Sequence, residues 1–364
     1  MRRCVMLMFL PLMLAAKPPE PSLCAGATAI VPLSCVESPR GVALAADRAR
    51  AEQLLALAEG GADRFVRHFG SAPARYAVAE NPDAPLAGDK ADALRAAGFK
   101  AVLPWLSAKA FRAQAAPAIR ASIAAQLPGA SAAVIDAATE QALEKQVGAA
   151  ARARVESAAV PHELGHDWYR LAFWPNAPRS KSQHYGGPGP DWLDEMAAVL
   201  MEAPAMYDER IDQFAKRYTA WRADPAAASE TDRLMIDLPH YLAEPHPAFA
   251  QVQAMLAAQS QQEAGAKRTT AQVITGDAGK RIGEASLRFY LQSAVAAQYL
   301  AERSGDPQVL ARIGAAFGRS ETIAQWLAND EPKGKLPRQL SALQADWLAW
   351  LAQRFPAGAA KPAA

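Results

Sequence analysis

Residues 191–201, with the sequence DWLDEMAAVLM, constrain the fold more than any other segment of this chain. The segment is apolar on nearly every side apart from Asp194 and Glu195, which predicts a buried helix that begins at Pro190 or Asp191. Burying a carboxylate is costly unless a partner compensates its charge. The fold must therefore bring such a partner to these two carboxylates.

A second segment, VPHELGHDWYR at residues 160–170, places two histidines four residues apart. On an α-helix this spacing puts both residues on one face, so His162 and His166 can aim ring nitrogens at a single ion. Glu163 lies one step round the helix and can reach a water molecule on that ion, as in the H-E-x-x-H motif of zinc hydrolases. The chain has only 6 histidines in 364 residues, which makes a chance match rare. The alternative is a helix with two solvated or core-packed histidines.

Catalytic zinc usually takes three protein ligands and keeps a fourth position for water. The buried helix at 191–201 offers Glu195 as the third ligand, and Asp194 can orient a ligand histidine through its second ring nitrogen. Competing third ligands are Asp191, Glu202 and His184. We expect Zn2+ from the ligand types, although nitrogen and oxygen sites of this kind bind several divalent ions.

The HELGH sequence at 162–166, followed by WLDE at 192–195, resembles the paired motifs of the gluzincin metallopeptidases. A third histidine six residues after the first pair would fall on Ala172, so the metzincin pattern fails. The resemblance implies that Glu163 is the general base. It also implies three zinc ligands, namely His162, His166 and Glu195.

Residues 289–327 resemble the aminopeptidase-N-like gluzincins and their bacterial relatives, in which a tyrosine opens a helix that is followed by a glycine and further helices. Tyr290 matches the tyrosine that stabilises the oxyanion in that family. A phenol can donate a hydrogen bond to a developing oxyanion without carrying charge itself. The alternative is a core aromatic within an apolar stripe that comprises Phe289, Ala294, Ala297 and Leu300.

The resemblance implies a zinc-dependent peptidase with a gluzincin, thermolysin-like catalytic domain, acting on a peptide or protein. Three features depart from the aminopeptidase-N pattern. The gap between His166 and Glu195 is longer than in those enzymes and makes room for the loop at residues 176–190. Pro161 stands directly before His162, where it can open the helix or kink it. No G-x-M-E-N motif is present, and AEN at 79–81 is too partial to replace it, so aminopeptidase activity is not expected. An inactive zinc-binding scaffold and a zinc hydrolase of a non-protein substrate remain alternatives.

Two polar loops are candidates for the rim of a cleft. They span residues 174–190 and 237–249, and they offer His184, Tyr185 or His240 as secondary hydrogen-bond donors. Loops rich in proline, glycine and histidine are also common as solvated connections.

The N-terminus predicts an exported protein, periplasmic or extracellular. A basic start and an apolar stretch too short to span a bilayer indicate a signal peptide over 1–27, cut after Ala27, with Ala16 as a second candidate. A cut after Ala27 leaves Cys35 alone, whereas a cut at Ala16 lets Cys24 and Cys35 pair. No stable membrane insertion is expected after cleavage; an uncleaved anchor is the alternative.

The rest of the chain favours helix, because alanine is abundant and β-branched residues are sparse. Expected elements are two helices broken at Gly60–Gly61 and ending near Gly70, strands at 74–80 and 99–107, the second an edge strand because of Pro104, and helices at 90–97, 108–127, 131–158 and 161–173. The expected organisation is a signal peptide (1–27), a small α+β N-terminal lobe (28–107), zinc-binding catalytic helices (108–205), a helical C-terminal lobe (206–353) and a disordered tail (354–364).

Charge excludes one class of partner. The 39 basic and 37 acidic side chains nearly cancel, and no basic run is interleaved with aromatic residues. Nucleic acid is therefore not an expected partner.

Overall fold

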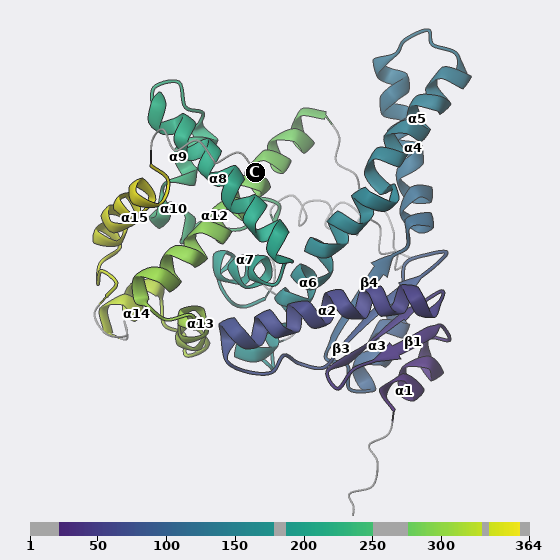
Figure 1. Ribbon diagram of the computed structural model, residues 1–364, viewed down its shortest axis with the longest axis horizontal. Helices are drawn as coiled ribbons and strands as arrows, with labels where there is room; N and C mark the ends of the chain where they lie inside the picture. The colour runs from purple at the N-terminus through teal and green to yellow at the C-terminus, as the bar shows by residue number, and fades with distance from the viewer. Residues whose placement is uncertain (1–21, 178–186, 250–275, 330–334, 357–364) are drawn as a thin grey trace, which may run out of the picture.

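The computed structural model describes residues 22–177, 187–249, 276–329 and 335–356. It is a mainly helical protein with one small four-stranded sheet (Figure 1). Among the described residues, no helix has the length and hydropathy needed to cross a bilayer. Several predicted features lie outside the described residues: the basic and apolar parts of the signal peptide, His184, Tyr185, and the tail beyond 356.

The N-terminal part alternates helices and strands: α1 (Leu23–Ile30), β1 (Ser34–Glu37), β2 (Gly41–Ala45), α2 (Arg48–Phe69), β3 (Tyr76–Asn81), α3 (Gly88–Ala96) and β4 (Ala101–Leu106). The middle of the chain is helical: α4 (Ala108–Gln126), α5 (Ala132–Val147), α6 (Ala149–Phe173) and α7 (Asp191–Leu200). The remainder forms α8 (Pro204–Ala223), α9 (Glu230–Met235), α10 (Leu238–Tyr241), α12 (Gly276–Ser304), α13 (Val309–Gly318), α14 (Ile323–Asn329) and α15 (Leu340–Arg354).

The sheet has the strand order β1-β2-β3-β4, with β1 antiparallel to β2 and the other pairs parallel. Alternate residues of β2 pack on opposite faces: Val42 and Leu44 belong to the cluster with α1 and α3, whereas Ala43 and Ala45 pack with α2. Both faces are covered, as is usual for parallel strands. The two predicted strands are confirmed, and β4 lies at the edge as Pro104 indicated. β1 and β2 were not predicted.

The predicted break at Gly60–Gly61 is wrong, because α2 is one continuous helix. It ends at Phe69, and the next residue, Gly70, has a φ of 71°, the left-handed conformation that glycine adopts readily. Gly61 has a packing role instead: a Cβ there would lie 2.7 Å from the Cβ of Pro161. The close contact between α2 and α6 outweighs the roughly 1 kcal/mol that a helical glycine costs relative to alanine.

The predicted helix boundary between 158 and 161 is also wrong. The break occurs at Gly148, and α6 runs with Pro161 in its interior. Proline has no N–H, so the carbonyl of Ser157 loses its helical donor. The N–H of Ala203, beyond the end of α7, donates to that carbonyl at 3.0 Å. The proline is therefore tolerated because another segment satisfies the freed acceptor.

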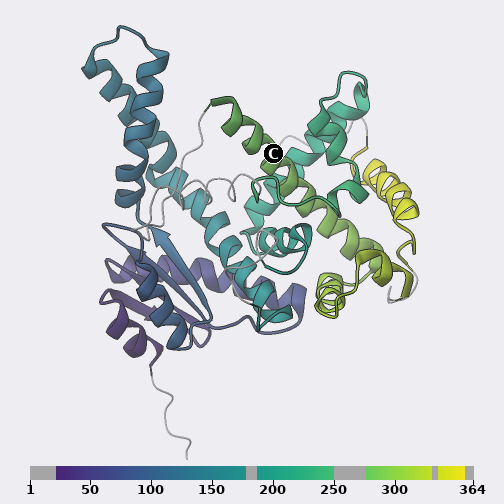
Figure 2. The ribbon, with the colours of Figure 1, turned by 180° about the vertical axis from the view of Figure 1, so that it is seen from behind.

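Helices α4 and α5 form a hairpin that projects from the body beside the sheet in both views (Figures 1 and 2). Basic side chains of α4 face acidic side chains of α5, as in the pair between Arg120 and Asp136 at 2.7 Å. The predicted start at residue 108 is confirmed. Most of this hairpin is exposed, and it meets the body at the base of α6.

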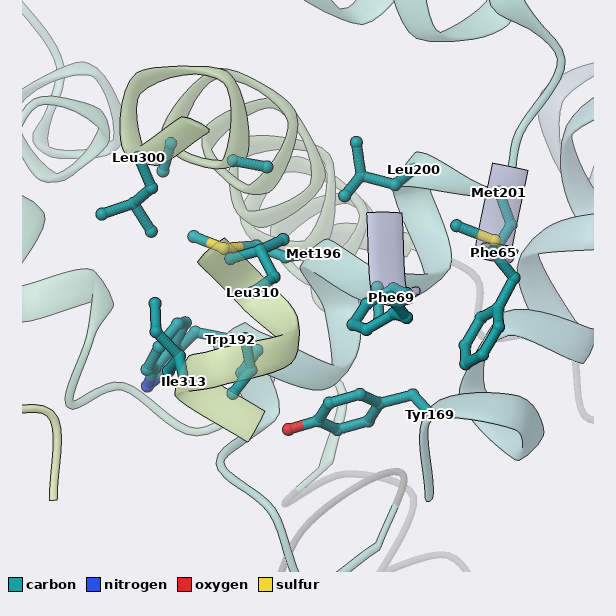
Figure 3. Packing of buried hydrophobic residues seen from close by; sticks show 14 of the residues in the cluster. Phe65, Phe69, Tyr169, Trp192, Met196, Leu200, Met201, Leu300, Leu310 and Ile313 are labelled. Atoms are coloured by element: carbon teal, nitrogen blue, oxygen red, sulfur yellow. The ribbon is translucent and has the colours of Figure 1, made fainter. Parts of the chain in front are cut away.

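One large core joins the N-terminal lobe to the C-terminal helices. Figure 3 shows how side chains from α2, α6, α7, α12 and α13 meet there; those labelled include Phe65, Phe69, Tyr169, Trp192, Met196, Leu300, Leu310 and Ile313. Every residue of α7 is buried, which confirms the prediction for 191–201. This helix is therefore fixed from all sides, and so are the carboxylates that it carries.

The first described residues belong to the fold. Ala27 is fully buried within α1, and Cys24 forms a disulfide with Cys35. A cut after Ala27 would divide α1 and remove Cys24, whereas a cut at Ala16 would keep both.

Two neighbouring glycines test the close packing of α2. Gly61→Ala should lower the free energy of unfolding by about 1–3 kcal/mol, because the new methyl group has no room beside Pro161. Gly60→Ala is the matched control: its methyl group would meet only the end of the Arg64 side chain, at 3.4 Å, and should stabilise by roughly 0.5–1 kcal/mol. Urea unfolding measures both. Equal stabilisation by the two substitutions would contradict the contact.

Candidate metal centre

The structure brings together the three residues predicted as ligands. His162 and His166 of α6 both turn a ring nitrogen toward Glu195 of α7. His162 Nε2 lies 3.3 Å from one oxygen of Glu195, and His166 Nε2 lies 3.9 Å from the other. The three side chains offer ligand atoms that all lie within 4.8 Å of one another. They could hold a metal ion.

Carboxylates hold the opposite nitrogen of each histidine. His166 Nδ1 lies 2.9 Å from Asp194, the role predicted for that residue, and His162 Nδ1 lies 2.9 Å from Glu202. A carboxylate can only accept, so each Nδ1 carries the proton, and in a neutral ring each Nε2 then presents its lone pair toward Glu195. Glu202, considered as a competing third ligand, instead orients His162.

Gly165 permits the close approach of α6 and α7 that this geometry requires. A Cβ at this position would lie 2.9 Å from the Cα of Ala198 and equally close to the side chain of Met201. Any larger residue would push α7 away from α6. The glycine inside the HELGH sequence therefore sets the distance between the histidines and Glu195.

A cationic side chain supports the second carboxylate. Arg210 of α8 donates to both oxygens of Glu202, at 2.7 and 2.6 Å. Burial alone would raise the pKa of Glu202, but hydrogen bonds from His162 and Arg210 outweigh it and lower that pKa. Glu202 therefore stays ionised and keeps its hold on the histidine ring.

Tyr290 of α12 lies at the same site. Its ring centroid is 5.9 Å from that of His162, and the guanidinium of Arg210 lies 5.2 Å from its ring. The neighbouring residues named as an apolar stripe are buried, whereas Tyr290 is only partly buried. It lies outside that stripe and faces the candidate metal centre.

Glu163 is the exposed member of the group. It follows His162 on α6 and remains accessible to solvent. Its charge acts on both histidines and on Glu195. The carboxylate is therefore close to the centre and open to a water molecule or a substrate.

His246 is a further residue of the site, and the sequence did not predict it. It is 2% exposed, and its Nε2 lies 3.9 Å from Glu195. The N–H of Ala248 donates to its Nδ1, and burial lowers the pKa of His246 to about 4, so the ring is neutral with its proton on Nε2. His240, named as a secondary donor, instead pairs with Glu244 at 3.5 Å. The sequence feature that could have indicated this residue is the proline on each side of His246, because two prolines restrict the backbone there.

The buried carboxylates of the candidate metal centre favour the presence of a positive charge beside them. Burial raises the pKa of Glu195, and the two histidines only partly oppose this. Burial alone would lower the pKa of His166, but Asp194 and Glu195 outweigh it and raise that pKa to about 10. Without a cation, the carboxylates thus draw protons onto the histidines. A bound cation would supply the same charge and displace those protons.

The residues fit a divalent cation. Glu195 Oε1 is buried and accepts no hydrogen bond from the described residues, a costly state for a carboxylate. Ligands about 2.1 Å from a tetrahedral ion are about 3.4 Å apart. His162 Nε2 lies 3.3 Å from Glu195 Oε1, close to that spacing, and one ligand atom from each of the three residues lies within 4.8 Å of the others. Two imidazole nitrogens with one carboxylate oxygen are also a common donor set of catalytic zinc.

Comparison with known proteins adds no relative to this picture. No protein-family model, curated protein or solved structure matches the chain.

Removing Glu195 tests the ligand set. Glu195→Ala should weaken zinc binding by more than about 100-fold, because loss of an outer-shell partner alone typically costs 10–100-fold. Glu163→Gln, the matched control, should keep one zinc per chain, since that side chain is not a ligand. Competition with a chromophoric chelator measures both. Tight stoichiometric zinc in Glu195→Ala would exclude Glu195 as the third ligand.

Proposed function

We propose that the protein is a zinc-dependent peptidase of the gluzincin type, with a thermolysin-like catalytic domain centred on α6 and α7. One observation carries the proposal: two anchored Nε2 atoms converge on Glu195 while Glu163, on the same helix, stays exposed. This arrangement separates the groups that hold the ion from the group that moves a proton.

The roles of the side chains follow from their positions. Zinc bound by His162, His166 and Glu195 would supply Lewis acidity and lower the pKa of a water molecule. Glu163 accepts a proton from the attacking water and delivers it to the leaving amine. Tyr290 donates a hydrogen bond to the oxyanion that develops on the scissile carbonyl. The proton on His246 Nε2 adds a second neutral donor beside the centre.

The substrate class rests on the resemblance of the HELGH and WLDE motifs to the gluzincin peptidases. A zinc hydrolase of another substrate would use the same core residues, and an inactive scaffold would keep the metal without turnover. Glu163 favours an enzyme, because an exposed carboxylate beside the centre has no role in holding the ion.

We also infer that the protein acts outside the cytoplasm. The disulfide between Cys24 and Cys35 supports this, because such bonds persist mainly in oxidising compartments. The basic start and the short apolar stretch support export, with the cut at Ala16 keeping the disulfide.

The catalytic role of Glu163 is tested by an isosteric change. Glu163→Gln should reduce peptide hydrolysis by at least about 100-fold, the contribution typical of general base catalysis, while zinc content is unchanged. The assay is cleavage of a diverse peptide mixture by the zinc-loaded protein, read by mass spectrometry.

Each outcome separates the candidates. Internal cuts that Glu163→Gln lacks support an endopeptidase, and trimming from the ends supports an exopeptidase. Full activity of Glu163→Gln would refute the mechanism. Absence of all cuts with zinc bound would favour a binding role or a non-peptide substrate.

A further inference from the structure

A cavity of about 330 Å³ lies between β4, α4 and α6, outside the candidate metal centre. Its walls are mostly apolar, with three residues from the edge strand, one from the projecting hairpin and one from α6. These are Pro104, Trp105, Leu106, Phe111 and Val155, and the remaining lining residues are Arg152 and Glu156. Val155 is 53% exposed, so a molecule that enters the cavity from solvent can reach its side chain.

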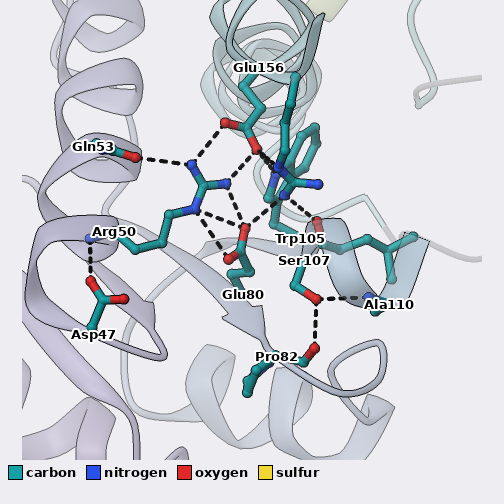
Figure 4. Close-up of polar contacts among 11 residues, drawn as sticks. Asp47, Arg50, Gln53, Glu80, Pro82, Trp105, Ser107, Ala110 and Glu156 are labelled. Atoms are coloured by element: carbon teal, nitrogen blue, oxygen red, sulfur yellow. Dashed lines mark hydrogen bonds and ion pairs between the residues drawn. The ribbon is translucent and has the colours of Figure 1, made fainter. Parts of the chain in front are cut away.

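The charged groups beside this cavity are paired. Arg50 bonds to both Glu80 and Glu156, and the indole N–H of Trp105 donates to Glu156 at 3.0 Å (Figure 4). Arg152 pairs with both glutamates, at 2.9 and 2.7 Å. Two positive and two negative side chains thus compensate each other. The cavity therefore favours an uncharged occupant.

The cavity and the metal centre share one face of α6. Val155 precedes His162 by seven residues, or about two helical turns, which places the two side chains on the same side and about 10.5 Å apart along the axis. An extended peptide rises about 3.3 Å per residue. Three residues of an extended substrate therefore cover the distance between the two places.

We infer that this cavity binds an apolar side chain of the peptide substrate, preferably aromatic, about three residues from the cleaved bond. The inference rests on the proposed function and adds a substrate preference to it. Three observations carry it: the apolar lining, the compensated charges, and the position two turns from His162 on one helix face. Apolar pockets of this kind discriminate between side chains by about 10-fold or more.

Cleavage of a diverse peptide mixture tests the preference. Wild-type protein should show enrichment of aromatic or large aliphatic residues three positions from the cut. Val155→Lys should abolish that enrichment, because it places a charge at the cavity. The matched control is Val134→Lys, which changes a valine of α5 that is 52% exposed and leaves the preference intact. Unchanged enrichment in Val155→Lys would overturn the inference.

A binding experiment separates the cavity from the hydrolytic activity. Zinc-loaded Glu163→Gln protein, with and without Val155→Lys, is titrated calorimetrically with acetyl-Phe-Ala-Ala-Ala-amide and its all-alanine analogue. The phenylalanine peptide should bind about 10-fold more tightly, and only when Val155 is present. This result without cleavage by wild type would uphold the cavity and refute the peptidase. Equal affinity of the two peptides would refute the cavity, even if wild type cleaves.

Discussion

The close contact between α6 and α7 at Gly165 is the constraint on which the rest of the structure depends. It sets the distance between two histidines on one helix and a buried carboxylate on the other. The core that surrounds α7 on all sides then prevents Glu195 from turning toward solvent. Burial of this carboxylate is unfavourable unless positive charge lies between it and the two histidines, and a bound cation would supply that charge.

Other residues orient the two histidines and leave one side of the candidate metal centre accessible to solvent. Glu202, fixed by Arg210, orients His162 from the buried side, and Asp194 orients His166. Glu163 remains on the exposed side of the same helix. Toward its N-terminus, α6 carries Val155 on the side that His162 occupies, next to the edge strand. The candidate ligand histidines and the cavity therefore lie along one helix, with the two histidines in its C-terminal half.

The sequence alone predicted the features that depend on a pattern within one segment. Spacing of four residues brought His162 and His166 together, and an apolar helix with two acids located Glu195 and Asp194. It did not predict the features that depend on contact with a segment far away in the sequence. Gly61 was predicted to break a helix, because its contact with Pro161, 100 residues away in the sequence, leaves no local pattern. Pro161 is accommodated inside α6 because the distant N–H of Ala203 bonds to the carbonyl of Ser157. The contacts of Glu202 and His246 leave no periodic signal, and β1 and β2 are too short for one.

The ligand set can be tested by anomalous diffraction from crystals of the zinc-loaded protein, recorded at the zinc absorption edge. We expect one peak per chain, about 2.0–2.2 Å from His162 Nε2, His166 Nε2 and a carboxylate oxygen of Glu195. A peak held instead by Glu202 or by the Nδ1 atoms would contradict the ligand set. Stoichiometric zinc bound elsewhere on the chain would contradict the metal centre itself.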